Sequence, residues 1–143
     1  METRTGFLIS QVKQVQSRIF QRLLTESGVD EFNGPQGRIL YVLWQEDGIP
    51  IARLVQQTGL AKSTLTAMLV RMEESGLITR ENSSADKRQV IICLTDTAKG
   101  LQDKYEQVSE EMNRLFYRGM TQEDADILDG LLERILANLQ ELL

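Results

Sequence analysis

Between residues 50 and 94 the spacing of the apolar residues changes from a helical period to the period of a β-strand. Two short helical segments come first, and Gly59 separates them. Two apolar runs follow at 77–81 and 90–94, and the polar segment 82–89 joins them. Short apolar runs on both sides of a polar loop predict a β-hairpin. The order therefore predicts a helix-turn-helix with a hairpin attached, in a mainly helical (mainly α, α+β) fold.

Long amphipathic helices are expected on both sides of this central part. Asn33 and Pro35 are typical of the start of a buried helix. A single long helix is expected after Thr95, and Thr121 with Asp124 three residues later predicts the start of the last helix. The chain thus divides into an N-terminal helix at 1–32, a winged helix-turn-helix at 33–95 and C-terminal helices at 96–143.

The terminal helices carry more apolar residues than a domain of 143 residues needs to cover its own core. Their apolar residues recur three and four positions apart, as in helices that pair with one another. We therefore expect both ends to serve as dimerisation helices of a homodimer. The alternative is that the same stripes cover only the core of a single chain. The predicted dimer-interface residues are Leu8, Val12, Val15, Ile19, Leu128, Leu132, Ile135 and Leu139.

Two residue counts exclude whole classes of activity. The chain has no histidine and a single cysteine, Cys93, which excludes histidine-dependent triads, imidazole metal sites and an internal disulfide. We expect no enzymatic activity, no cofactor and no metal. Cys93 alternates in phase with Ile91, so we expect a buried, inert thiol. The sequence also lacks an 18-residue apolar run and a signal peptide, so a soluble, cytoplasmic protein without a membrane partner is expected.

The distribution of charge favours a nucleic-acid partner although the net charge is −5. Eleven of the 21 acidic residues lie beyond Thr95, whereas residues 48–72 contain three basic residues and no acid. The second helix of a helix-turn-helix fits the DNA major groove, and the loop of an attached hairpin can reach the minor groove. The predicted DNA contacts are Lys62, Ser63, Thr64, Thr66, Ala67, Val70 and Arg71 on the helix, and Ser83, Ser84, Asp86, Lys87 and Arg88 in the wing loop. The alternatives are ordinary solvated surfaces, or a winged helix that binds proteins and not double-stranded DNA.

Three short motifs resemble those of the MarR family of bacterial transcriptional regulators. Asp86-Lys87-Arg88, followed after five residues by Leu94-Thr95, is similar to that family's wing signature. Residues 76–80 resemble its strand entry, and 32–36 its second-helix start, with Asn33 in place of threonine or serine. The resemblance implies a homodimer that binds a pseudo-palindromic operator and represses transcription, with 62–74 as recognition helix and Arg88 as the wing arginine.

The same resemblance implies regulation by a small aromatic or lipophilic ligand, or by cysteine oxidation. The family's peroxide sensors carry a reactive cysteine in the first helix, where this chain has none. A ligand is therefore the expected effector, if there is one. Phe7, Tyr41 and Trp44 are suited to line an apolar ligand cleft, although aromatic residues on helices also serve as plain core.

Overall fold

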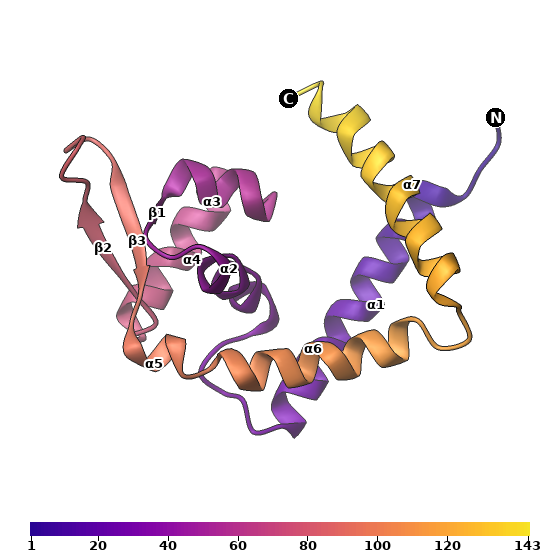
Figure 1. The fold of residues 1–143 in the computed structure, drawn as a ribbon, viewed down its shortest axis with the longest axis horizontal. Coiled ribbons are helices and arrows are strands. Elements are labelled where there is room, and N and C mark those ends of the chain that lie inside the picture. The colour runs from indigo at the N-terminus through magenta and orange to yellow at the C-terminus, as the bar shows by residue number, and fades with distance from the viewer. The chain divides into compact units, whose positions relative to one another are not determined.

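The computed structural model describes all residues, 1–143, and contains seven helices and three short strands. They follow one another as α1 (Thr5–Glu26), α2 (Gly34–Gln45), β1 (Ile49–Pro50), α3 (Ile51–Thr58), α4 (Lys62–Glu74), β2 (Ile78–Asn82), β3 (Val90–Leu94), α5 (Asp96–Lys99), α6 (Gln102–Phe116) and α7 (Gln122–Gln140). Figure 1 shows this order along the chain. The chain forms two compact units, residues 1–109 and 110–143, with the boundary inside α6.

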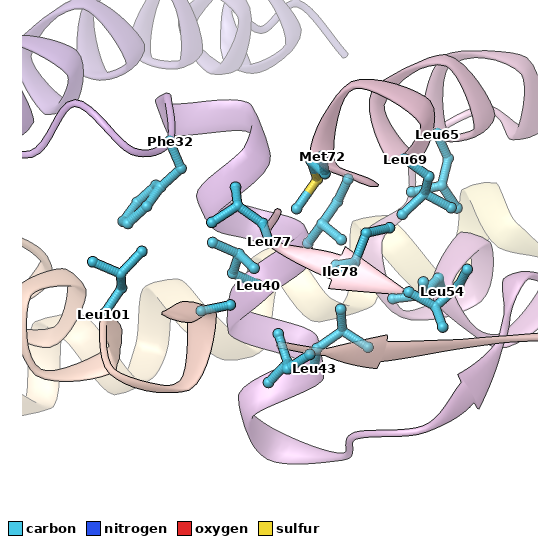
Figure 2. Close-up of a cluster of buried hydrophobic side chains, with 14 of the residues drawn as sticks. Phe32, Leu40, Leu43, Leu54, Leu65, Leu69, Met72, Leu77, Ile78 and Leu101 are labelled. Atoms are coloured by element: carbon cyan, nitrogen blue, oxygen red, sulfur yellow. The ribbon is translucent and has the colours of Figure 1, made fainter. Parts of the chain in front are cut away.

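The core of the first unit lies between α2, α3, α4 and the small sheet (Figure 2). Leucine and isoleucine side chains from these elements fill it, and Met72 from α4 and Phe32 from the segment before α2 join them. Their helical spacing in the sequence directs one face of each helix inward. The completely enclosed members are Leu24, Ile39, Leu40, Leu43, Leu54, Leu65, Leu69, Met72 and Ile92.

Side-chain caps fix several of the helix starts that the sequence predicts. The Asn33 side chain accepts a hydrogen bond from the Gln36 N–H, and the Gln36 side chain accepts one from the Asn33 N–H. Thr121 and Asp124 form the same reciprocal pair at the start of α7. Each pair satisfies two backbone donors that a helix start leaves free. Both predicted starts are therefore confirmed.

The sheet has the strand order β1-β3-β2, and both pairings are antiparallel. Ile78 lies opposite Leu94 and Asn82 opposite Val90, so β2 and β3 form the predicted hairpin. The strand β1 was not predicted, because two residues that include a proline show no strand period. It adds a second neighbour to β3, since Ile49 lies opposite Ile92.

Two sequence predictions about the segment after β2 are wrong. The single long helix expected after Thr95 is interrupted at Gly100-Leu101, which separates α5 from α6. Cys93 and Ile91 are only half-buried, whereas Ile92 and Leu94 point into the core. Residues 90–94 are all apolar, so the sequence does not show which alternate side chains of this strand face the core.

The second unit contains the end of α6, the turn at Gly119 and α7. No residue of α7 is buried, although apolar residues occur along its whole length. The exposed ones are Ile127, Leu131, Leu132, Leu136 and Leu139, and Leu142 just beyond the helix is exposed as well. In the first unit, Phe7, Leu8, Ile9, Val12 and Val15 near the start of α1 are likewise exposed. None of the helices combines the length and apolar character needed to cross a bilayer.

Candidate nucleic-acid interface

Helix α4 presents a face of small uncharged side chains to solvent. Its buried residues are Leu65, Leu69 and Met72, so the opposite face is the exposed one. Ser63 and Ala67 are exposed there, and Val70 is 42% exposed. Hydroxyl and methyl groups on a narrow helix face can approach base edges in a major groove closely.

Thr66 differs from its predicted neighbours on this face. It is half-buried, and its hydroxyl donates a hydrogen bond to the Lys62 carbonyl over 2.8 Å. The hydroxyl oxygen keeps its acceptor lone pairs. Of the two predicted hydroxyl contacts on the outer side, Ser63 is therefore the freer donor.

The positive charge of the acid-free stretch concentrates on α4. Arg53 in α3 forms an ion pair of 2.8 Å with Glu46. Lys62 and Arg71, at the two ends of the α4 face, take part in no ion pair. No side chain caps the start of α4, because Ala61 stands at the N-cap, and no acid lies in its first turn. Uncapped N–H groups beside a lysine attract phosphate oxygens.

The wing loop between β2 and β3 is ordered by its own side chains. One Asp86 carboxylate oxygen accepts hydrogen bonds from the Arg88 backbone N–H at 3.0 Å and from its Nε at 3.2 Å. The Ser83 hydroxyl oxygen accepts from the Ala85 and Asp86 N–H groups. The Arg88 side chain is nonetheless 92% exposed, so it is held at its base and free at its tip. Figure 1 shows this loop at the end of the hairpin.

Two residues at the base of the hairpin tie it to the helices. The Thr95 hydroxyl donates to the Gly76 carbonyl at 2.7 Å and accepts from the Ala98 N–H, so it joins the end of α4 to the start of α5. One Asp47 carboxylate oxygen accepts from the Leu94 N–H at 2.8 Å and from the Gly48 N–H. The sequence indicated Thr95 as a helix cap. It did not indicate Asp47, whose partner is 47 residues away.

The residues predicted to line a ligand cleft do not come together. Tyr41 and Trp44 lie in one aromatic cluster with Phe32 and Tyr105, and the ring centres of both Tyr41 and Trp44 are within 6.0 Å of that of Tyr105. The indole N–H of Trp44 donates to the Ala98 carbonyl. Phe7 is 68% exposed and pairs with no other ring.

The sequence did not single out Arg38, whose positive charge acts to lower the pKa values of both Lys13 and Tyr105. Loss of hydration and the positive charge of Arg38 lower the pKa of the Lys13 ammonium. Burial raises the pKa of the Tyr105 hydroxyl, while a hydrogen bond with Ser109 acts in the opposite direction.

Cys93 lies on the outer side of β3. Burial, followed by the negative charges of Glu81 and Asp47, raises the pKa of its thiol above the ordinary value of 9.0. A thiol in such surroundings stays protonated at neutral pH and reacts slowly. The residue is therefore less buried than expected, but its chemical environment is that of an unreactive cysteine.

The comparisons with known proteins agree with this geometry. Residues 32–90 match the sequence model of the MarR family. The chain is 30% identical to the HTH-type transcriptional regulator TtmR of Methylorubrum extorquens over 99% of its own length and 69% of that protein. Among solved structures, a mutant of MarR from E. coli in complex with operator DNA superimposes with a TM-score of 0.83 at 24% identity, covering 92% of each chain. BpsR from Bordetella bronchiseptica, whose DNA binding is regulated by 6-hydroxynicotinic acid, gives 0.82 at 19% identity over 91% of each chain.

The sequence relatives decide between the two readings of the winged helix. The similarity to TtmR extends over nearly the whole chain, including both terminal helices and the wing. A winged helix that serves only for protein contacts is thereby set aside. The chain belongs to the MarR family of DNA-binding winged helix-turn-helix transcriptional regulators.

Proposed function

We propose that this chain is a repressor that binds a pseudo-palindromic operator as a homodimer and is released by a small aromatic or lipophilic ligand. The observation that carries the proposal is the exposed face of small uncharged side chains on α4, Ser63, Ala67 and Val70, with unpaired Lys62 and Arg71 at its ends. It lies in one unit with a wing whose Arg88 is held by Asp86. The operator-bound structure of E. coli MarR, which shares the fold, supports it. A dimer seated on a promoter represses by occupying it.

Each predicted DNA contact has a separate role in this proposal. Lys62, Thr64 and Arg71 contact phosphates, and Ser63, Thr66, Ala67 and Val70 face base edges. In the wing, Lys87 and Arg88 reach the adjacent minor groove, and Ser83 and Ser84 lie near phosphates, with Asp86 holding Arg88. Base-edge contacts determine which sequence is preferred, and phosphate contacts supply affinity for any sequence. Ser63→Ala should therefore change the preferred operator more than it changes affinity for random DNA.

The proposed dimer rests on apolar surface that one chain leaves uncovered. Leu8, Val12 and Val15 of α1 are each at least 40% exposed, as are Leu132 and Leu139 of α7. Ile19, Leu128 and Ile135 are half-buried on the same two helices. Contiguous exposed apolar residues of this number are typical of a protein interface. We also propose that the chain divides into three parts at residues 32–33 and 95–96, and that the middle part binds DNA.

The proposed effector site is the one predicted from the sequence, Phe7, Tyr41 and Trp44, of which Tyr41 and Trp44 lie in the aromatic cluster around Tyr105. An aromatic ring can stack on the half-exposed Tyr41. The regulation of BpsR by 6-hydroxynicotinic acid, an aromatic acid, supports this class of ligand. The Trp44 ring is held in place by its hydrogen bond to the Ala98 carbonyl, whereas Phe7 is exposed.

Selection of bound duplexes from random DNA tests the proposal. We expect a pseudo-palindrome with half-sites about one helical turn apart, roughly 34 Å. Affinity for it should fall with salt along a log-log slope of up to about −7, because Lys62, Arg71, Lys87 and Arg88 give eight cations per dimer. If no motif emerges, or if salt leaves affinity unchanged, the assigned DNA surface is wrong.

A further inference from the structure

Arg80 has a feature shared by no other cation of the chain: two of its guanidinium nitrogens, Nε and Nη2, are buried and have no hydrogen-bond partner. Arg80 lies on β2 opposite the buried Ile92, two residues after the buried Ile78, so its side chain leaves the sheet on the core side. Arginine is rarely placed in such surroundings without a partner.

The one ion pair of Arg80 reaches the proposed recognition helix, α4. Arg80 Nε lies 3.6 Å from a carboxylate oxygen of Glu73 in the last turn of α4. This distance permits attraction between the charges but exceeds that of a hydrogen bond. A closure of less than about 1 Å would complete a charge-assisted bond, whose donor–acceptor distance is about 2.8 Å.

The two residues belong to the two elements that are assigned to DNA. Glu73 lies three residues after Val70 and seven after Thr66, on the same side of α4 as the proposed base contacts. Arg80 precedes the wing loop on the strand that leads into it. The Arg80–Glu73 pair is the only ion pair that joins α4 to the hairpin.

We propose that Arg80 is a positioning residue that sets the wing against the recognition helix through Glu73, so that both reach one duplex together. This inference rests on the proposed function. DNA that engages both elements favours the closed pair, and the closed pair favours DNA to the same extent, because the coupling is reciprocal. Arg80 itself need not touch DNA.

The sharpest test is Glu73→Gln, measured as affinity for the selected operator by fluorescence anisotropy. Removal of an acid near DNA strengthens binding by simple electrostatics, whereas loss of the positioning pair weakens it. We expect affinity to fall about tenfold, within the range of coupled neighbours. Lys104→Gln is the matched control, because it breaks a similarly long ion pair of 3.8 Å with Glu31, away from α4 and the wing. It should leave affinity unchanged.

A double-mutant cycle separates positioning from plain stabilisation. If Arg80 positions the wing, Arg88→Ala should lose most of its effect in an Arg80→Gln background, and the salt slope of Arg80→Gln should fall by about 2 per dimer. Arg80→Lys keeps the positive charge but lacks the planar guanidinium donors, so its operator affinity should lie between those of the wild type and Arg80→Gln. Glu73→Gln provides the same cycle with Arg88→Ala if Arg80→Gln fails to fold.

Additive effects with an unchanged slope, or tighter operator binding by Glu73→Gln, would overturn the inference. If Arg88→Ala alone has no effect in the wild-type background, the proposed wing contact fails. The sign of the Glu73→Gln effect then still decides whether the pair positions α4.

Discussion

At the residue scale, the wing arginine shows how a single carboxylate prepares a contact. Asp86 holds both the backbone and the side chain of Arg88, so the exposed guanidinium has less conformational freedom to lose on binding. This pairing is local, because the two residues are two positions apart in the motif Asp86-Lys87-Arg88. It did not indicate Asp47, Glu73 or Arg80 as partners, because their contacts join segments that only folding brings together.

Arg88→Ala should weaken operator binding at least about tenfold, because each dimer loses two charged contacts of roughly 1 kcal/mol or more. The measurement is a titration of labelled operator at fixed salt. Arg114→Ala is the matched control, since Arg114 is also an exposed arginine paired with an acid, Glu111, but lies in the second unit. Equal losses for the two variants would contradict a specific role of the wing.

Cys93 should react with iodoacetamide more slowly than a free thiol at pH 8. Its raised pKa lowers the thiolate fraction at any pH below that pKa, so the rate should continue to increase with pH beyond the ordinary value of 9.0. The measurement is the alkylation rate by mass spectrometry across pH 7–10, with the unfolded chain as reference. A rate that levels off below pH 9 would show that the thiol is activated.

At the scale of elements, prediction succeeded where local signals were strong. The recognition helix 62–74 agrees with the structure at both ends, because a positive-φ glycine lies on each side of it, at Gly59 and Gly76. Prediction failed for β1, which is a strand only because it pairs with β3. It also failed for the break before α6, which no clear local sequence pattern marks. Of the candidate site, the α4 and wing residues were accessible from sequence, and the Glu73–Arg80 ion pair between them was not.

The approach of α2 to α6 is close at Gly37. A Cβ there would lie 2.8 Å from the Tyr105 ring and 3.2 Å from that of Phe32. Gly37→Ala should therefore lower the free energy of unfolding by about 1–3 kcal/mol, as overpacked cores do. Urea denaturation gives the value. Gly130→Ala in α7, where no atom lies within 4 Å, should be neutral or stabilising, and a loss there equal to that at Gly37 would exclude the steric explanation.

At the scale of the whole molecule, the proposed interface depends on side chains that are exposed in one chain. Leu132→Glu with Leu139→Glu places charges on residues that are 40% and 58% exposed, so a single chain should tolerate them. In an interface the same charges lose their hydration without a partner, which should weaken dimerisation at least about 100-fold. Sedimentation velocity measures the change, and Asn138→Glu is the control. An unchanged dimer would show that α7 lies outside the interface.

The exposed surface of α7 makes the stability of the protein depend on its concentration, if a second copy covers that surface. A helix with no buried residue gains stability only from whatever covers it. Where a second copy covers α7, dilution dissociates the dimer and lowers the stability of the protein. The melting temperature then rises with chain concentration. A cell that makes little of this chain would then lose operator occupancy more steeply than in proportion to the amount of protein.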